Sequence, residues 1–326
     1  MNISSKELVS IGLLIYNAEK YLKFAIESLL KQDYENFEIV ISDNCSTDKT
    51  EEICRYYATQ DNRIRYHRNS ENIGAARNYD LVFRLSRGKY FAWASFDDIW
   101  HENFISKCVY HLEKYPNAVM CAPAIEFMNQ DGSIITEGDL SLYDNFSTLG
   151  MNYLQRFKAL LLREGWYSIF GLVRRNYLED IKIDRLNYGA DVIILSDLIR
   201  QGDFVKYPEK LFYYRNFQNK TELDRYKTLD SPSAERSFLY PNFSMYYEIM
   251  LVALKGQNSV FKKLYAYFYL QGVIWNSKLW KRKTRDEIKY YFHHSLEEKN
   301  FLKIITSFPF FLRFHIFRKI SSRRWK

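Results

Sequence analysis

Hydrophobic and polar positions follow two different spacings along the first 115 residues. Short, near-continuous apolar runs predict buried strands, and the segments between them carry apolar residues three and four positions apart, which predicts helices. Expected strands cover residues 8–16, 37–42, 63–67 and 89–95, and expected helices follow at 17–30, 46–57, 74–85 and 102–114. Asn17 is expected to cap the first helix. Strands alternating with helices predict an α/β fold, a parallel sheet with helices on both faces.

The second half of the chain has a less regular pattern. Residues 118–128 are expected to form a strand, residues 191–200 a helix that ends at Gly202, and residues 204–215 one or two short strands. Residues 219–238 are polar, and from Tyr240 onward the pattern is helical and rich in aromatic residues. These changes predict an α/β domain at residues 1–218, a linker at 219–239 and a helical extension at 240–326.

Composition and local sequence patterns argue against a zinc site, a signal peptide and a membrane-spanning helix. Hydrophobic residues make up 47% of the chain, which is enough to bury a sizeable core. Four cysteines, at 45, 54, 108 and 121, form no CxxC pair and no zinc-like cluster, so we expect reduced thiols in a cytoplasmic protein. The first seven residues lack the basic and apolar regions of a signal peptide. No apolar stretch approaches about 18 residues, so no membrane-spanning helix is expected.

Positive charge is concentrated at the C-terminal end. The formal net charge is +8, and residues 299–326 hold eight Lys or Arg with no Asp or Glu, interleaved with Phe, Leu and Ile. This pattern predicts an interfacial helix on an anionic membrane, at the inner face of the cell membrane. The alternative is a tail that packs on the protein's own surface. Nucleic acid is not expected as a partner, because no basic domain accompanies the tail.

Polar residues follow three of the predicted strands, at the point where each strand ends. Tyr16 and Asn17 follow the first strand, Asp43 follows the second, and Asp97 and Asp98 follow the fourth. In open α/β sheets, ligands bind at the carboxyl ends of the parallel strands. We therefore expect these side chains to line one crevice.

Three segments carry a family resemblance in an ordered series: VSIGLLIYNAEKYLKFAIESLLKQDYENFEIVISDNCSTDKT, then ENIGAARN, then FAWASFDDIW. Over roughly residues 7–215 the chain resembles glycosyltransferase family 2 enzymes of the GT-A fold. The resemblance implies a nucleotide-sugar transferase that moves a sugar, with inversion, from a nucleotide-diphosphate donor to an acceptor hydroxyl. A UDP-linked donor is the expected form.

The resemblance also implies roles for the residues around the nucleotide. Tyr16, next to Asn17, would stack on the base, Asp43 would accept an N–H of a pyrimidine, and Arg77 would lie near the nucleotide. Each position also has an ordinary structural explanation. Tyr16 could be an aromatic at the rim of the core, Asp43 a turn residue, and Arg77 a solvated helix residue.

Asp97 and Asp98 emerge from an apolar, aromatic strand. Unpaired carboxylates are costly there, and Mn²⁺ or Mg²⁺ bridging them to a diphosphate relieves that cost, so both are candidate metal ligands. The alternative is a cap for the next helix. Family members commonly carry a further acid just before this pair, where this chain has Ser95 and Phe96, so ribose recognition departs from the family pattern.

An inverting transferase needs a general base to take the proton of the acceptor hydroxyl. Asp191, in YGADVIILSDLIRQGDF, matches the family's base, with Asp197 as its rival and an ordinary helix-terminal Asp as the alternative. The expected acceptor is a glycan or a lipid-linked molecule, and a homo-oligomer is possible. Rival functions are a nucleotidyltransferase, whose glycine-rich basic loop residues 17–19 do not provide, and a non-catalytic membrane-associated binding protein.

Overall fold

The computed structural model describes residues 7–136, 144–163, 166–185, 189–216, 241–283 and 285. Its sheet has eight strands in the order β3-β2-β1-β4-β7-β6-β8-β5. The strands are β1 Val9–Ile15, β2 Phe37–Asp43, β3 Ile64–Arg68, β4 Tyr90–Ser95, β5 Ile99–Trp100, β6 Ala118–Met128, β7 Leu172–Arg174 and β8 Asp203–Arg215. The α-helices are α1 Leu22–Leu30, α2 Thr50–Gln60, α3 Ala75–Leu85, α4 Phe104–Lys114, α5 Tyr153–Leu161, α6 Ala190–Gln201, α8 Pro241–Lys255 and α9 Val260–Asn276. Short 3-10 helices cover Tyr167–Phe170, Arg175–Tyr177 and Ile183–Arg185.

Half of the sheet is parallel, as the alternation of strands and helices predicted. β3, β2, β1 and β4 run in the same direction, while β7 is antiparallel to both β4 and β6. β8 is one long strand rather than one or two short ones, because it pairs with β6 along its length and with β5 near its end. The sheet is therefore mixed beyond β4.

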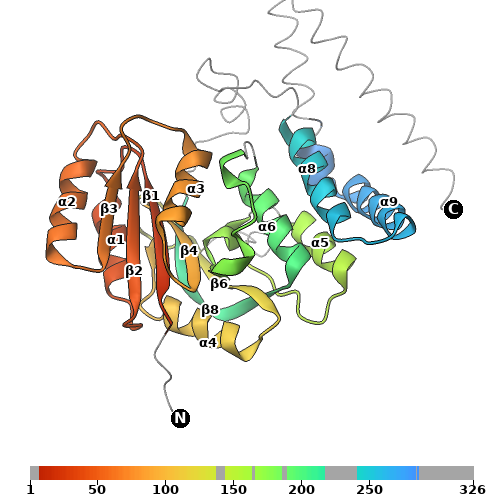
Figure 1. The fold of residues 1–326 in the computed structure, drawn as a ribbon, viewed down its shortest axis with the longest axis horizontal. Coiled ribbons are helices and arrows are strands. Elements are labelled where there is room, and N and C mark those ends of the chain that lie inside the picture. Colours follow the sequence, from red (N-terminus) through yellow and green to blue (C-terminus); the bar gives the residue numbers. More distant parts are fainter. Residues whose placement is uncertain are drawn as a thin grey trace, which may run out of the picture. The chain divides into compact units, whose positions relative to one another are not determined.

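Alternation along β4 shows how the sheet separates two packed layers. Ala92 and Ala94 belong to the core cluster that also holds the buried face of α1. Phe91 and Trp93 point to the opposite face, where their ring centroids lie 4.9 Å apart and Phe83 of α3 stacks edge-on against Phe91. Figure 1 shows α1 and α3 on opposite sides of the strands. Both faces are thus buried, which explains why the strands have continuous apolar runs.

The chain divides into two compact units built from interleaved segments. The first holds residues 1–218 and 247–275, and the second holds residues 219–246 and 276–326. α9, up to residue 275, and the part of α8 from Tyr247 onward therefore belong to the unit that contains the sheet. The expected linker at 219–239 and the basic tail at 299–326 lie outside the described residues. Among the helices that are described, none combines the length and apolar character needed to cross a membrane.

Candidate functional site

The predicted polar clusters lie at one edge of the sheet. β1 lies between β2 and β4, with Ile15 paired to Asp43 and Leu14 paired to Ser95. Tyr16 therefore follows β1 beside Asp43, and Asp97 follows β4 two residues after Ser95. The strand order brings together residues that are more than fifty positions apart in the sequence.

Tyr16 and Asn17 have different surroundings. The side chain of Tyr16 is 45% exposed, so its ring is available to a ligand. Asn17 has a positive φ of 49°; its backbone N–H donates to Ser46 Oγ (2.9 Å), and its Oδ1 accepts from the backbone N–H of Thr47 (2.9 Å). The expectation that Asn17 caps the first helix is wrong: α1 begins at Leu22, because the amide oxygen of Asn17 is used to join two loops.

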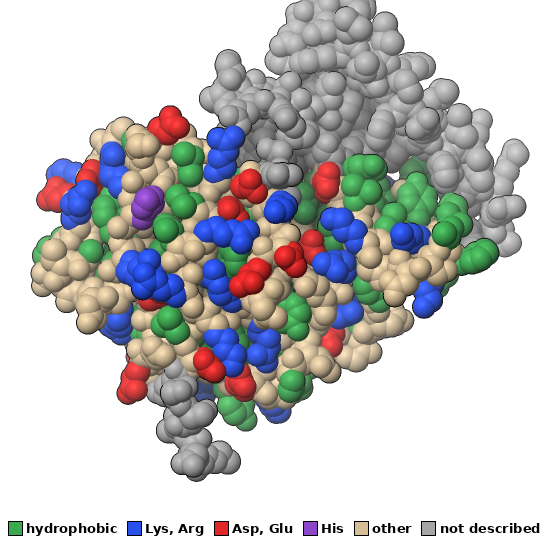
Figure 2. Space-filling view, in the orientation of Figure 1, with side chains coloured by type: hydrophobic (Ala, Val, Ile, Leu, Met, Phe, Trp, Pro, Cys, Tyr) green, Lys and Arg blue, Asp and Glu red, His purple; other side chains and the backbone are tan. Residues whose placement is uncertain are grey.

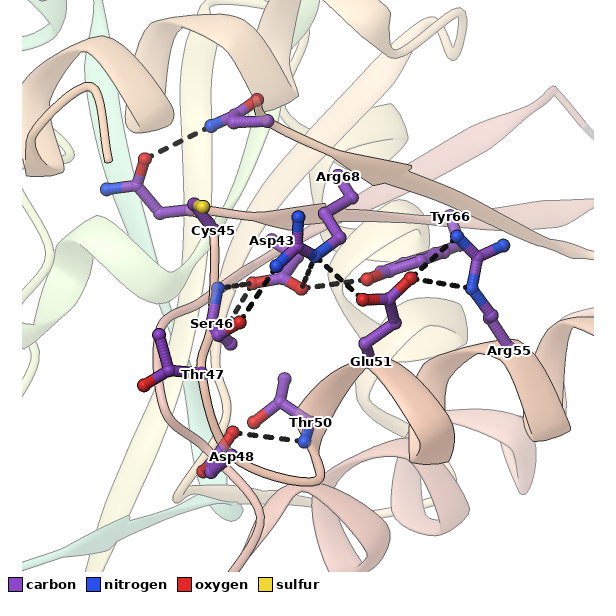
Figure 3. A network of polar contacts seen from close by, with 12 residues as sticks. Asp43, Cys45, Ser46, Thr47, Asp48, Thr50, Glu51, Arg55, Tyr66 and Arg68 are labelled. Atoms are coloured by element: carbon purple, nitrogen blue, oxygen red, sulfur yellow. Dashed lines mark hydrogen bonds and ion pairs between the residues drawn. The ribbon is translucent and has the colours of Figure 1, made fainter. Parts of the chain in front are cut away.

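Asp43 is completely buried, and donors of this chain surround its carboxylate (Figure 3). Its Oδ1 accepts from the backbone N–H (2.9 Å) and the hydroxyl (2.6 Å) of Ser46, and its Oδ2 accepts from the Tyr66 hydroxyl (2.7 Å). Arg68 Nε lies 3.7 Å from Oδ2. The carboxylate thus fixes the loop after β2, and burial together with the Asp43 charge raises the pKa of Tyr66.

Arg68 links this network to α2. Its Nε lies 2.9 Å from Glu51 Oε2, and its Nη2 donates to the carbonyl oxygen of Ser46 (2.9 Å). Asn44 extends the network in the other direction, because its Oδ1 accepts from the backbone N–H of Ile73 (2.9 Å). Asn44 thereby fixes the segment that precedes α3. Arg77 lies exposed in the first turn of that helix, which begins after Gly74, whose φ is +84°.

Cys45 lies in the same loop in an unusual backbone conformation. It has a φ of 65°, and Cys45 and Asn17 are the two non-glycine residues with positive φ in the described part of the chain. Such conformations favour glycine and persist where surrounding contacts hold them, often at functional sites. Asn17 lies in the loop after β1 and Cys45 in the loop after β2. The two unusual backbone conformations thus occur at the edge of the sheet where the polar clusters lie.

Arg215 organises the acidic pair after β4, and the sequence analysis did not single it out. Its backbone N–H donates to Asp98 Oδ1 (2.8 Å), and its Nε donates to the carbonyl oxygen of Asp97 (2.7 Å). Its Nη1 donates to the carbonyl oxygen of Gln130 (2.9 Å), and its guanidinium lies 4.6 Å from the ring centroid of Tyr21. The available signal was its position, since Arg215 is the last residue of a strand, as Asp43 is of β2.

Asp97 and Asp98 differ in exposure. Asp97 is half-buried, and its Oδ1 accepts from Ser95 Oγ. Asp98 is 1% exposed, and its Oδ2 is buried without a hydrogen-bond partner. Burial, and then the charge of Asp97, raise the pKa of Asp98 well above its ordinary value, against the lowering effect of Arg215. The ionised form of Asp98 is therefore costly in this structure.

This donor set fits a divalent cation completed by a ligand. No group of three or more His, Cys, Asp or Glu side chains capable of holding a metal occurs among the residues that the structure describes. Mg²⁺ typically binds one or two carboxylates and takes its other ligands from water and substrate phosphates. Two carboxylates with one unsatisfied buried oxygen match that arrangement.

Asp191 lies in the first turn of α6, after Gly189, which adopts the left-handed conformation with φ 74°. Its Oδ1 accepts from the backbone N–H of Val192 (2.9 Å). The rival Asp197 instead forms an ion pair with Arg200 at 2.5 Å. Asp197 is therefore held by its own helix.

Tyr79 of α3 is influenced by acids from two other segments of the chain. Burial raises the pKa of Tyr79, and the charges of Asp191, Asp98 and Asp97 raise it further. The two metal candidates and the base candidate therefore act electrostatically on the same phenol. Tyr79, two residues after Arg77, was another residue that the sequence analysis missed.

Comparison with known proteins identifies the family and the fold. The model for "Glycosyl transferase family 2" matches residues 10–181, more than half of the chain. An uncharacterized glycosyltransferase of Haemophilus influenzae is 26% identical over 95% of this chain and 91% of its own length. Glycosyltransferase GlyG of Streptococcus pneumoniae is 34% identical over 39% of this chain, and the match spans 42% of GlyG, less than half of that protein.

Solved structures show the same fold at low sequence identity. S. aureus TarS in complex with UDP-GlcNAc superposes with a TM-score of 0.56 at 15% identity, covering 87% of this chain and 81% of that chain. The mannosyltransferase PcManGT of Pyrobaculum calidifontis, in complex with GDP-Man and Mn²⁺, gives a TM-score of 0.50 at 13% identity, covering 83% and 76%. The expected GT-A α/β fold is thus confirmed, and the family match confirms the resemblance in the sequence. This chain belongs to glycosyl transferase family 2.

Proposed function

We propose that this glycosyltransferase moves a sugar from a nucleotide-diphosphate donor to a hydroxyl of a glycan or lipid-linked acceptor, with inversion at the anomeric carbon. The observation that carries the proposal is the carboxylate pair at the carboxyl edge of the sheet, where Asp98 is buried with one carboxylate oxygen unpaired. Asp191 is the separate carboxylate, and its charge raises the pKa of Tyr79 together with the charges of that pair. An inverting transfer needs those two parts: a holder for the diphosphate's metal and a base for the acceptor.

The donor end of the site lies at the carboxyl edge of β1, β2 and β4. The exposed ring of Tyr16 stacks on the base, and Arg77 binds near the nucleotide. Asp43 forms the floor and, with Asn17, holds the two loops that enclose the base. Any bond from Asp43 to a base N–H adds to the three bonds that its carboxylate already accepts.

Asp97, with Asp98, would hold Mn²⁺ or Mg²⁺. When bound, the cation neutralises the charge that develops on the departing nucleoside diphosphate. The protein's part is to fix the acidic pair, and Arg215 does so by binding the Asp97 carbonyl oxygen and the Asp98 carboxylate. Ser95 and Phe96 stand where family members commonly carry the ribose-contacting acid, and Ser95 donates a hydrogen bond to Asp97.

Asp191 acts as the general base. Its carboxylate takes the proton of the acceptor hydroxyl as that oxygen attacks the anomeric carbon, and the bond to the diphosphate breaks. Its position in the first turn of α6 stabilises the charged form through the helix dipole. The proton therefore ends on Asp191 and the negative charge on the diphosphate.

Relatives and structural neighbours suggest the donor class and the biological setting. TarS has been solved with UDP and UDP-GlcNAc, and TuaG of Bacillus subtilis, 35% identical over 31% of this chain, is assigned by name to teichuronic acid biosynthesis. We propose a UDP-sugar donor and a role in cell-surface polysaccharide or glycolipid synthesis, in the cytoplasm at the inner face of the membrane. Membrane binding by residues 299–326 remains a prediction, because that tail lies outside the described residues. A homo-oligomer likewise remains a prediction.

The experiment is a donor screen on the full-length protein. UDP- and GDP-linked sugars are tested for thermal stabilisation and for hydrolysis, each with Mn²⁺ and with EDTA. We expect one UDP-sugar to stabilise the protein and to be hydrolysed slowly, both only with metal. Stabilisation without hydrolysis or transfer under any condition would identify a non-catalytic binding protein instead.

A further inference from the structure

Helix α9 exposes a row of large apolar side chains. Five residues on it have exposed fractions of 50% or more: Val260 (71%), Phe261 (85%), Leu264 (50%), Tyr265 (66%) and Phe268 (58%). Their spacing of three to four positions places them along one side of the helix. Isolated apolar residues on a surface are ordinary, but a contiguous row on one helix indicates an interaction surface.

The end of α8 enlarges this apolar surface. Tyr247 is 61% exposed and Leu251, one turn later, is 37% exposed. Figure 2 shows hydrophobic side chains gathered over the α8–α9 end of the sheet-containing unit, with Lys and Arg side chains among them. We call the seven residues of α8 and α9 named above the α9 face.

The α9 face is attached to the rest of the unit that contains the sheet, which we call the catalytic unit. On its other side α9 buries Ala266 and Leu270. The Tyr153 hydroxyl of α5 donates to the Ala253 carbonyl oxygen of α8 (2.7 Å), and a Cβ atom on Gly256 would lie only 2.3 Å from that hydroxyl. α5 in turn packs against α6, the helix of Asp191. A surface bound by the α9 face would therefore hold the active site at a set distance and orientation.

Charge indicates what that surface is. Between Glu248 and Asp286 the sequence has no acidic residue and eight Lys or Arg. Three of these, Lys255, Lys262 and Lys263, are exposed on or next to the α9 face. A helix that combines exposed aromatic residues with lysines, and that is too short to span a bilayer, suits the interface of an anionic membrane.

We propose that the α9 face docks the catalytic unit onto an anionic lipid bilayer, independently of residues 299–326. A second copy of this chain is a poorer partner, because a contact between two α9 helices would bring together lysines with no acidic residue on either helix. The cationic tail is a poorer partner for the same reason, since residues 299–326 carry eight positive charges and no negative one. An anionic lipid surface matches both the apolar row and the lysines. The proposal does not depend on which nucleotide sugar the protein uses or on how it reacts.

The test is co-sedimentation of full-length protein with vesicles of phosphatidylcholine alone or of equal parts phosphatidylcholine and phosphatidylglycerol, at low and high salt. We expect binding to the anionic vesicles that weakens with salt. Replacing both Phe261→Ser and Phe268→Ser should weaken vesicle binding at least about tenfold, because apolar insertion is lost. Replacing both Lys262→Ala and Lys263→Ala should weaken it about tenfold at low salt and much less at high salt.

A matched control separates this surface from exposed aromatic residues in general. Tyr110 on α4 is 61% exposed, and Tyr110→Ser should leave vesicle binding unchanged. All variants should keep the wild-type melting temperature and the wild-type rate of donor hydrolysis without lipid, since none touches the site. Wild-type vesicle binding by the double Phe variant would overturn the proposal and assign binding to another segment. A lipid-free dimer that the double Phe variant dissociates would overturn it in favour of a second copy.

Discussion

Asp43 and Asp98 are both buried aspartates at the same edge of the sheet, but their carboxylates are satisfied in opposite ways. Asp43 accepts three hydrogen bonds from Ser46 and Tyr66 and has Arg68 nearby. Asp98 accepts one, from the Arg215 backbone, and its Oδ2 has no partner. Buried polar groups are normally paired, so an unpaired carboxylate oxygen calls for an explanation.

We propose that the difference separates a part of the site that the chain completes alone from a part that a ligand completes. Around Asp43 the protein supplies the hydrogen-bond donors itself, so the proposed floor of the nucleotide site is formed before any nucleotide sugar binds. At Asp98 one buried carboxylate oxygen is left unpaired beside the charge of Asp97, which burial makes costly. In the proposed function a divalent cation provides the compensating positive charge, and this half of the site would form together with its ligand.

Removing a proposed metal ligand should have the largest effect on transferase activity. Asp97→Asn should lower transferase turnover by about 10³-fold or more, because metal stabilisation of the leaving group contributes several kcal/mol. EDTA should do the same to the wild type. The measurement is product formation with the donor that the screen identifies, over a Mn²⁺ titration. Wild-type activity of Asp97→Asn in EDTA would mean that the acidic pair is not a metal site.

Removing the base should have the next largest effect. Asp191→Asn should lower kcat about 10²-fold or more while leaving donor affinity nearly unchanged, because a general base acts on the acceptor proton. Asp197→Asn is the matched control on the same helix, and it should lose only the ion pair to Arg200. Nucleotide titration and steady-state kinetics check both. A loss of donor affinity in Asp191→Asn with normal turnover would reassign Asp191 to donor binding.

The stability of two variants in the absence of metal tests the contrast between Asp43 and Asp98. Asp43→Asn should destabilise the protein by about 2 kcal/mol, because it places an amide among buried donors that require an acceptor. Asp98→Asn should leave stability unchanged or raise it, because it removes a buried charge that is repelled by Asp97. Urea unfolding of both variants in EDTA gives the two values. Equal destabilisation would show that the two carboxylates are equally satisfied.

Acid should weaken the stabilising contribution of a third buried carboxylate, Glu38, which is hydrogen-bonded as Asp43 is. We expect this effect on stability to be the smallest. Burial by itself raises the pKa of Glu38, but hydrogen bonds from Ser10, Arg65 and Arg87 outweigh it and lower the pKa below its ordinary value. A lowered pKa in the folded state means that Glu38 stabilises the protein above about pH 4.3, and that this contribution is lost as the pH falls toward the folded pKa.

Glu38→Gln should therefore be less stable than wild type at neutral pH, by about 1 kcal/mol for the weakened bonds. The gap should narrow as the pH falls below about 4.3. Urea midpoints of both proteins across that range measure it. A gap that stays constant with pH would remove Glu38 from the set of stabilising carboxylates.

The parallel half of the fold was predictable because its signal is local. A buried strand between helices needs an apolar run, and those runs place β1, β2, β3 and β4 within one or two residues of their observed ends. Loop contacts were less predictable. Asn17 has the residue type of a helix cap, but its partner is Thr47, thirty positions away. A capping rule that reads neighbouring residues cannot find such a partner.

The sequence by itself determined the α/β class, the family and the acids at the strand ends, because all three depend on residue types at local spacings. Only the tertiary structure decided which acids are satisfied, since that depends on donors from distant segments. Arg215 reaches Asp97 and Asp98 because β8 lies at the far side of the sheet from β1 yet pairs with β5, which directly follows the acidic pair. Likewise, the charge of Asp191 raises the pKa of Tyr79, which lies more than a hundred residues earlier in the chain. Burial and long-range pairing set the charge balance of the site, and neither is encoded in the spacing of any single motif.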